Sequence, residues 1–226
     1  MRSLAILQAI HLNSQRVPRK MLARVGEKTL LEIGLEKLRQ VHLERRVPIL
    51  FAVSYEDQEL CNLVDAQGFE RIEIGQVAAS ADGYQAVFTD WTQGLANRFD
   101  WVIDANFICR PFLRLETILD FVDRAMIAKE AFVACVAERG LIWSQTGKML
   151  LGIGQVADTK NNPVYYRLAH LGYAHPANLW NEQMLAAAAR PESFSLLPAE
   201  CIDIDTANDL EFARLFQKGL DSADSV

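Results

Sequence analysis

The sequence lacks several features that would place it in common functional classes. It has no apolar run of about 18 residues, so no membrane span is expected. The N-terminus also lacks the layout of a secretion signal, in which a basic stretch precedes a long apolar one, and we therefore expect a cytoplasmic protein. Lys and Arg number 23 against 29 Asp and Glu, giving a net charge of -6. This balance argues against a broad basic face and hence against nonspecific nucleic-acid binding.

Familiar site fingerprints are missing as well. The sequence contains no GxGxxG, no GxxxxGK[ST] and no GxSxG, so it gives no sign of the usual dinucleotide, P-loop or serine-hydrolase sites. The four cysteines, Cys61, Cys109, Cys135 and Cys201, show no CxxC spacing and lie in apolar contexts. This pattern favours buried free thiols in a reducing cytoplasm over disulfides or zinc.

What the sequence does contain is a regular alternation of apolar runs and amphipathic stretches. The predicted strands are 4–10, 48–54, 71–74, 99–107, 131–136, 194–197 and 201–204. The predicted helices are 29–41, 55–67, 81–96, 115–129, 180–189 and 207–218. The alternation predicts an α/β fold of three layers, with a mostly parallel sheet and helices on both faces, in one domain over residues 1–226.

The regular alternation fails between residues 139 and 176. Glycines at positions 140, 147, 152 and 154 punctuate this stretch, and Asn161-Asn162-Pro163 is typical of a turn. We interpret the segment as a small antiparallel excursion that projects from the domain and serves in dimerisation.

The loop after the first strand carries an unusual local charge. Between residues 14 and 24 there are four cations and no acidic residue: Arg16, Arg19, Lys20 and Arg24. A first strand that feeds a first helix through such a loop is a common place for phosphate in α/β proteins. Arg supplies a fork of donors and Lys a point charge for phosphate oxygens. The alternative is a solvated basic turn shaped by Pro18.

A pair of carboxylates lies in and directly after the last predicted strand. If residues 201–206 are extended as in a strand, Asp203 and Asp205 project on the same face and repel each other. A divalent cation relieves such repulsion, and Mg²⁺ prefers oxygen ligands shared with substrate phosphates. The alternative is a helix cap, in which Asp205 or Thr206 caps the last helix and Asp209 stands at the third position after Thr206. The cap explains Asp205 but leaves Asp203 without a role, and both interpretations hold together.

Weaker candidates lie in the middle of the chain. Arg167 follows two tyrosines and is a candidate for binding a substrate carboxylate through two hydrogen bonds, although a surface arginine is the default interpretation. His170 and His175 are five residues apart with no further ligand nearby, so no zinc site is predicted.

The two ends of the chain resemble one enzyme family. Ser14, Arg16, Pro18 and Lys20 match part of a loop written A-R-x-G-S-x-R-x-P-x-K, and residues 202–213 match I-D-I-D-T-x-x-D-[LF]-x-x-A throughout. Looser matches occur between, over residues 99–102, 111–118 and 163–173. These motifs are similar to those of the cytidylyltransferases that activate acidic sugars, which include the acylneuraminate (CMP-sialic acid) synthetases.

This resemblance implies a nucleotide-diphospho-sugar transferase-like, Rossmann-like fold and a homodimer. It implies transfer of CMP from CTP to a 2-keto-3-deoxy acid such as sialic, pseudaminic or legionaminic acid or 3-deoxy-manno-octulosonate, with release of pyrophosphate. The implied catalytic residues are Arg16, Lys20 and Asp205, and the implied cofactor is Mg²⁺ on Asp203 and Asp205. The loop residues His11, Asn13, Ser14, Arg16 and Lys20 would bind the nucleotide, and Arg167 the sugar carboxylate.

The loop also departs from the family pattern. His11 stands where the family has an arginine, and Asn13 where it has a glycine. Histidine is mostly neutral at pH 7 and replaces the lost cation only in part. We therefore describe a divergent member, and the alternative is a noncatalytic relative that keeps the fold and binds a nucleotide or a partner. A third alternative is transfer from a different nucleotide, because no pattern in the sequence indicates which base the protein recognises.

Overall fold

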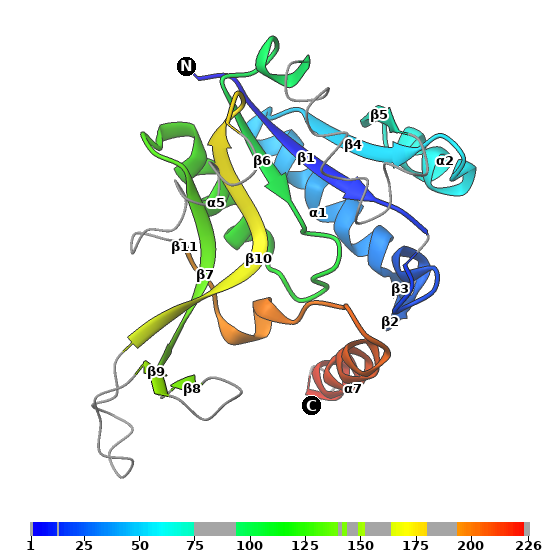
Figure 1. Cartoon of the computed structure of the whole chain (residues 1–226). Helices are drawn as coiled ribbons and strands as arrows, with labels where there is room; N and C mark the ends of the chain where they lie inside the picture. Colours follow the sequence, from blue (N-terminus) through cyan, green and yellow to red (C-terminus); the bar gives the residue numbers. More distant parts are fainter. Residues whose placement is uncertain are drawn as a thin grey trace.

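The computed structural model describes residues 2–12, 14–74, 94–139, 142–143, 149–151, 164–179 and 194–223. Over these residues, the main sheet has seven strands in the order β11-β7-β10-β6-β1-β4-β5 (Figure 1). The strands are β1 Leu4–Ile10, β4 Ile49–Ser54, β5 Glu70–Ile74, β6 Trp101–Ala105, β7 Phe132–Arg139, β10 Val164–Pro176 and β11 Phe194–Ser195.

Most strand pairs of this sheet are parallel. Strand β1 pairs in parallel with β4 and with β6, β4 with β5, and β7 with β11. Only β10 runs antiparallel to its partners β6 and β7 within the described sheet. The predicted α/β class with a mostly parallel sheet is therefore confirmed.

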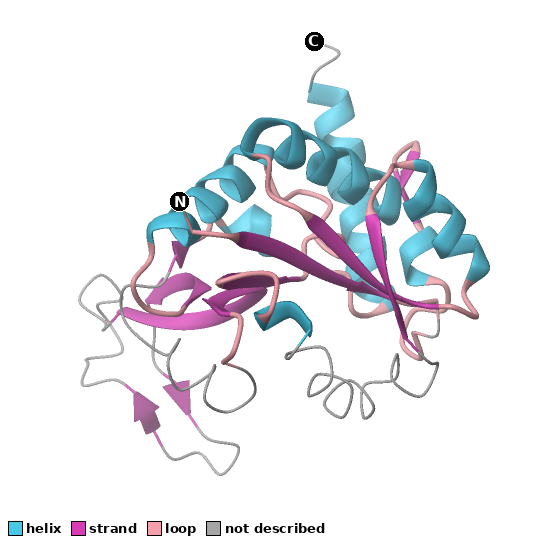
Figure 2. Ribbon diagram, turned by 90° about the horizontal axis from the view of Figure 1, so that it is seen from above, coloured by secondary structure: helices cyan, strands magenta, loops and turns pink. Residues whose placement is uncertain are grey.

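Helices cover the sheet and two small hairpins extend from it (Figure 2). The helices are α1 Leu30–Arg45, α2 Gln58–Ala66, α5 Leu115–Ile127 and α7 Ala207–Ala223, with the 3-10 helices η1 Lys20–Leu22 and η3 Pro198–Cys201. The hairpins are β2 Arg24–Val25 with β3 Lys28–Thr29, and β8 Ile142–Trp143 with β9 Met149–Leu151. The predicted helix 180–189 and most of the predicted helix 81–96 lie outside the described residues.

Strand β1 is buried on both faces, which explains its continuous apolar run. Leu4 and Ile6 face the main core, to which α1, α2 and α5 contribute. Ala5 and Leu7 face a second, smaller core on the other side of the sheet, where Leu95 packs. The side chains alternate because successive residues of a strand point to opposite faces.

Helix α1 begins at a capping box that the sequence encodes locally. The Thr29 hydroxyl accepts a hydrogen bond from the Glu32 amide, and the Glu32 carboxylate accepts one from the Thr29 amide. Farther along, Gly34 lets the helix approach the loop after β6, since a Cβ there would lie 2.6 Å from Ile108 Cγ1. The close packing fixes a loop that contributes to the site described below.

Two predicted features differ from the structure. The predicted strand 201–204 is wrong, because Pro198 begins a 3-10 helix and the chain after it is extended but joins no sheet among the described residues. Its Ile204 amide instead donates to the Cys109 carbonyl at 2.9 Å. The segment 164–176 lies in the central sheet as β10, so the antiparallel excursion outside the main sheet is, in the described residues, the β8–β9 hairpin. A role for residues 139–176 in dimerisation stays a prediction.

The helices and the cysteines relate to two expectations from the sequence. Over the residues that the structure describes, no helix combines the length and apolar character needed to cross a membrane. All four cysteines are free, and Cys61, Cys109 and Cys135 are buried while Cys201 is half-buried. The prediction of free thiols is confirmed.

Buried His175 is expected to make the fold sensitive to acid. This side chain is fully buried, and burial lowers its pKa to about 4. Because the ordinary pKa is about 6.5, the neutral form stabilises the fold above that pH and the benefit is lost as the pH falls toward 4. We expect the free energy of unfolding to fall by about 2–3 kcal/mol between pH 7.5 and pH 4.5 from this residue alone.

Urea denaturation at several pH values measures this effect. His175→Gln should reduce the dependence of stability on pH over that range, whereas His42→Gln, at an exposed position on α1, should leave it unchanged. An unchanged dependence in His175→Gln would show that other groups cause the acid sensitivity.

Candidate functional site

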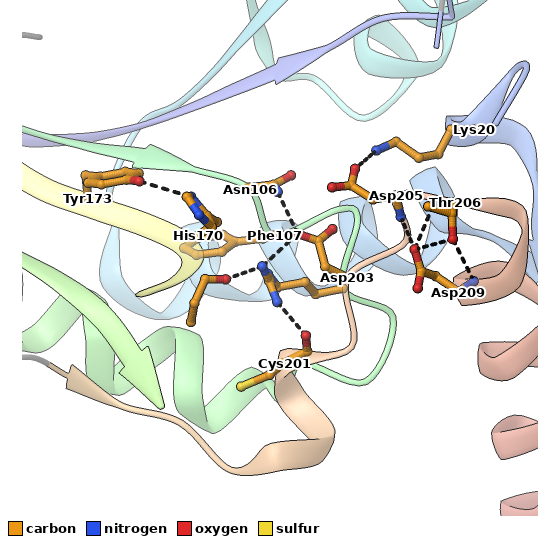
Figure 3. Close-up of polar contacts among 12 residues, drawn as sticks. Lys20, Asn106, Phe107, His170, Tyr173, Cys201, Asp203, Asp205, Thr206 and Asp209 are labelled. Atoms are coloured by element: carbon orange, nitrogen blue, oxygen red, sulfur yellow. Dashed lines mark hydrogen bonds and ion pairs between the residues drawn. The ribbon is translucent and has the colours of Figure 1, made fainter. Parts of the chain in front are cut away.

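The order of the strands points to one edge of the sheet. Strand β1 lies between β6 and β4 in the sheet. After β1 the chain adds β4 and β5 on one side and then β6 on the other, so the direction in which strands are added reverses at β1. In open α/β sheets, ligands bind at the carboxyl ends of the strands at such a switch point. The loops after β1 and β6 meet the extended segment 202–206 at this edge (Figure 3).

Short-range contacts shape the loop after β1. The Ser14 hydroxyl accepts a hydrogen bond from the Val17 amide at 3.3 Å, which closes a turn. Arg19 adopts a left-handed backbone, with φ of 53°, just before η1. Its guanidinium pairs with Glu59 of α2 at 2.6 Å, away from the acidic pair. The same bend directs Lys20 toward the C-terminal segment, so the loop separates its cations into two groups.

Arg16 and Lys20 converge on one carboxylate. Lys20 Nζ and Arg16 Nη2 each lie 3.2 Å from Asp205 Oδ1. The Lys20 side chain is only 11% exposed, whereas that of Arg16 is 66% exposed. Burial works to lower the pKa of Lys20, but nearby Cys109 and the hydrogen bond to Asp205 raise it above its usual value. Burial raises the pKa of Cys109 to about 11, so this thiol is protonated at neutral pH and Asp205 is the effective partner.

Asp203 has a different cationic partner, which the sequence interpretation missed. Arg110, in the loop after β6, donates from Nη2 to Asp203 Oδ2 at 2.7 Å, and its side chain is 2% exposed. It also donates to the backbone carbonyls of Ala169 and Cys201. One buried guanidinium therefore joins the loop after β6, strand β10 and the C-terminal segment. The signal that could have indicated such a partner was the unbalanced acidic pair itself, because two buried carboxylates require a cation nearby.

The second oxygen of Asp203, Oδ1, is buried and unpartnered among the described residues. Burial raises the pKa of this carboxyl, and the Arg110 guanidinium works against the rise. The described residues contain no group of three or more His, Cys, Asp or Glu placed to hold a metal. Two carboxylates, one of them with an unpartnered oxygen, nevertheless fit Mg²⁺, which takes few protein ligands and completes its shell with water and substrate phosphates.

His11, at the start of the loop, is held in its neutral form. Burial and the charge of Lys20 lower its pKa, although Asp57 opposes the change. Asp57 also accepts a hydrogen bond from the Leu12 amide at 3.1 Å and so ties the loop to the start of α2. His11 thus does not restore the missing cation of the loop. Asn13 lies outside the described residues.

An irregular part of β10 brings another histidine to the site. The pairing of β10 with β7 shifts register between Leu168 and Tyr173, and His170 in between has a left-handed backbone with φ of 49°. The Tyr173 hydroxyl lies 3.2 Å from His170 Nδ1. The imidazole is close enough to Asp203 to oppose slightly the rise in the pKa of that carboxyl, which burial causes and which Arg110 opposes more strongly. Sequence reasoning considered His170 only as a zinc ligand and so missed this placement.

Arg167 lies in a different environment. On β10, its Nε donates to Glu138 of β7 at 2.8 Å, and its side chain is 55% exposed. Tyr165 donates to the same carboxylate at 2.7 Å. None of the contacts found among the described residues joins Arg167 to the acidic pair.

The segment that carries the two aspartates leads directly into a capped helix. The Thr206 amide donates to Asp209 Oδ2 at 2.6 Å, and the Asp209 amide donates to the Thr206 hydroxyl at 3.3 Å. The Asp205 amide donates to the same carboxylate at 3.1 Å. The predicted cap is therefore confirmed, and it fixes the backbone next to Asp205 while the Asp205 side chain turns toward Lys20 (Figure 3).

Comparison with known proteins identifies relatives of the fold. No protein-family model matches the chain, and no curated protein does.

Among solved structures, 4-diphosphocytidyl-2C-methyl-D-erythritol synthase from Anaerococcus prevotii is similar with a TM-score of 0.66 and 14% identity, over 96% of each chain. A CMP:2-keto-3-deoxy-manno-octonic acid synthetase complexed with CTP has a TM-score of 0.60 and 14% identity, over 96% of this chain and 98% of its own. A further 4-diphosphocytidyl-2C-methyl-D-erythritol synthase has a TM-score of 0.61 and 18% identity, over 95% of this chain and 99% of its own. At these identities the comparisons establish the fold.

Proposed function

We propose that this chain is a cytidylyltransferase that transfers CMP from CTP to an acidic 2-keto-3-deoxy sugar and releases pyrophosphate. The observation that carries the proposal is the convergence of Lys20 and Arg16 on Asp205 at the switch point of the sheet. The names of the similar structures support it, since they describe two diphosphocytidyl-methylerythritol synthases and a CMP-sugar synthetase bound to CTP.

The chain's own residues supply charge and orientation. In phosphoryl-type transfer the protein acts mainly by positioning the reactants and neutralising developing charge. Lys20, buried and charged, would contact the phosphates from a fixed position, and the exposed Arg16 would close over them. Ser14 and the loop amides would help to hold the phosphates, with neutral His11 at the start of the loop. Asn13 is proposed as a further nucleotide-binding residue. The attacking group is the sugar's anomeric hydroxyl, and the leaving group is pyrophosphate.

The two aspartates would hold Mg²⁺ between nucleotide and sugar. When bound, Mg²⁺ neutralises charge on the phosphate oxygens and polarises the phosphorus that is attacked. Asp203 offers its unpartnered Oδ1, and Asp205 offers a carboxylate that is 43% exposed beside the cations of the loop. Arg110 keeps the other oxygen of Asp203 occupied, so Oδ1 is the atom that this carboxylate would offer to the ion.

The acidic sugar is the finer part of the proposal. It rests on the resemblance of residues 14–20 and 202–213 to the enzymes that activate such sugars. Arg167 is proposed for the sugar carboxylate, which would have to replace Glu138 as the partner of its guanidinium. The proposed protein acts in the cytoplasm and as a homodimer.

One observation favours the alternative of a noncatalytic relative. Arg110 already neutralises Asp203, and Lys20 with Arg16 already neutralises Asp205, so the acidic pair is balanced without a metal. Such a protein would keep the fold and bind a nucleotide or partner without turnover. A cytidylyltransferase and this relative differ in how binding of CTP depends on Mg²⁺.

Asp205→Asn is expected to weaken the binding of CTP when Mg²⁺ is present but not when it is absent. With Mg²⁺, the variant loses a metal ligand, and we expect binding to weaken by about tenfold or more. With EDTA, it loses a negative charge next to the phosphates, and binding should equal or exceed that of the wild type. Isothermal titration calorimetry with CTP under both conditions measures the two affinities.

Glu36→Gln serves as the matched control, because Glu36 is an exposed carboxylate that pairs with Lys28 on the surface. It should leave the affinity unchanged under both conditions. Equal affinity of the Asp205→Asn variant and the wild type for CTP with Mg²⁺ would reject the metal assignment.

A further inference from the structure

His170 has a backbone conformation that is unusual for its place in the fold. Three non-glycine residues among those described have a positive φ: Arg19, Arg46 and His170. Arg46 ends α1, where a left-handed residue is common, and Arg19 forms the turn before η1. His170 instead lies within β10, and its φ of 49° is unfavourable for a residue with a Cβ. Strain of this kind is concentrated at functional sites, where the surrounding structure imposes it.

Hydrogen bonds on either side of His170 hold this conformation. The Ala169 carbonyl accepts a hydrogen bond from Arg110, and the Leu171 carbonyl accepts one from the Asn106 amide at 2.8 Å. Ala169 and Leu171 are buried, whereas His170 between them is exposed. The loop after β6 therefore fixes the irregular part of β10 and leaves the imidazole exposed beside the acidic pair (Figure 3).

Tyr173 orients the imidazole. Its hydroxyl lies 3.2 Å from His170 Nδ1. Burial and the nearby Asp104 raise the pKa of Tyr173, so the hydroxyl keeps its proton and can donate it in this hydrogen bond. A neutral imidazole that accepts at Nδ1 carries its own proton on Nε2. Within the part of the chain that the structure describes, no hydrogen bond occupies Nε2, so this N–H is available to a ligand.

The imidazole and the loop cations lie on opposite sides of the acidic pair (Figure 3). Lys20 contacts Asp205 on one side. His170 lies on the other side, near enough to Asp203 to act on the pKa of its carboxyl. With the phosphates of CTP held at Lys20, the attacking group approaches from the far side, because the attacking and leaving oxygens are roughly in line. His170 therefore lies in the half of the site that receives the acceptor, the substrate to which CMP is transferred.

The chemistry of this half favours a hydroxyl as the group that His170 contacts. A carboxylate of the acceptor placed beside Asp203 would meet a charge of the same sign, which is unfavourable. A hydroxyl carries no charge and can accept a hydrogen bond from an N–H while it donates its own proton to another oxygen. One N–H donor next to a carboxylate therefore suits a hydroxyl better than a second carboxylate.

We propose that His170 is an acceptor-binding residue, whose Nε2–H donates to a hydroxyl of the acceptor and holds it beside Asp203. The inference rests on the proposed function, which supplies the acceptor, and it adds a contact that no motif of the sequence indicates. It leaves the carboxylate of the sugar to Arg167. It also gives a reason for the strained backbone, because the strain places the imidazole where the acceptor binds.

His170→Gly tests the proposal with two readouts. Glycine adopts a positive φ without strain, so the midpoint of urea denaturation should rise. With the sugar that supports pyrophosphate release, we expect KM for the sugar to rise by about fivefold to tenfold, through loss of one hydrogen bond. The value of kcat should change less, and calorimetry with Mg²⁺ should show unchanged affinity for CTP. An unchanged KM, weakened binding of CTP or a lowered midpoint would each overturn the proposal.

Arg46→Gly is the matched control. Arg46 is exposed, has a φ of 56°, and precedes β4, so it lies at the edge of the sheet opposite the acidic pair. Its replacement should also raise the midpoint but leave KM for the sugar unchanged. A wild type that releases pyrophosphate while His170→Gly keeps the same KM rejects His170 alone. A wild type that releases none with any sugar rejects the proposed function and this inference with it.

Two further measurements identify the contact. Tyr173→Phe removes the hydroxyl that orients the imidazole, so KM should rise less than in His170→Gly and little further in the double variant. Analogues of the sugar that each lack one hydroxyl locate the contacted group, since His170→Gly should not raise KM further for the analogue that lacks it. Full additivity with every analogue would contradict a contact to a hydroxyl. Circular dichroism of each variant verifies that it is folded.

Discussion

Lys20→Met is expected to lower kcat/KM for pyrophosphate release from CTP by roughly a hundredfold to a thousandfold. The ammonium group is nearly buried and is held by Asp205, so it meets the phosphates from a fixed position and costs little reorganisation during the reaction. Arg16→Met should have a smaller effect, because that side chain is 66% exposed and is screened by solvent. Steady-state kinetics with a coupled pyrophosphate assay measures both.

Lys28→Met is the matched control for this prediction. Lys28 belongs to β3, near the same loop, but it is exposed and pairs with Glu36 at 2.6 Å. Its replacement should leave kcat/KM unchanged. If Lys20→Met and Lys28→Met behave alike, Lys20 does not contact the reacting phosphates and the site assignment is wrong.

Arg110→Met should lower the free energy of unfolding by about 3–5 kcal/mol. The substitution keeps an apolar stem but leaves the Asp203 carboxylate in a buried place without its partner, and it leaves the carbonyls of Ala169 and Cys201 without a donor. Removing one member of a buried ion pair is costly because the other charge stays desolvated. Urea denaturation followed by circular dichroism measures the loss.

Arg167→Met provides a surface pair for comparison. Arg167 and Glu138 lie 2.8 Å apart, close to the 2.7 Å of the Arg110–Asp203 pair, but Arg167 is 55% exposed. We expect a cost of about 0–1 kcal/mol there. The double variant Arg110→Met with Asp203→Asn should recover part of the loss, because the buried charge is removed as well. A cost for Arg110→Met as small as that for Arg167→Met would show that Arg110 does not stabilise Asp203.

The sequence predicted the central parallel strands β1 and β4 because they are apolar on both faces. The run at residues 48–54 became β4 within one residue, and the run at 4–10 became β1 at both ends. Residues 201–204 are also apolar in alternation, and this led to a wrong strand. The pattern cannot distinguish a strand from an extended segment that makes a single backbone hydrogen bond to a loop, as Ile204 does with Cys109.

Part of the candidate site was predicted, because some of its residues form local patterns of charge in the sequence. Charge and spacing identified the four cations of the loop and the acidic pair, and the family resemblance singled out Arg16 and Lys20. The structure brings these two cations to Asp205. Arg110 was missed because a single arginine before a proline carries no local signal, and its role arises only when three distant segments meet. His170 was missed because its approach to Asp203 depends on a register shift in β10.

Pyrophosphate release from CTP and Mg²⁺, measured across a panel of acidic nonulosonic and octulosonic sugars, tests the central claim most directly. We predict release with one sugar of the panel, which Asp205→Asn abolishes and Glu36→Gln does not. Release would show that a loop with His11 and Asn13 supports turnover. The account would be contradicted if no sugar gave release and calorimetry showed no binding of CTP.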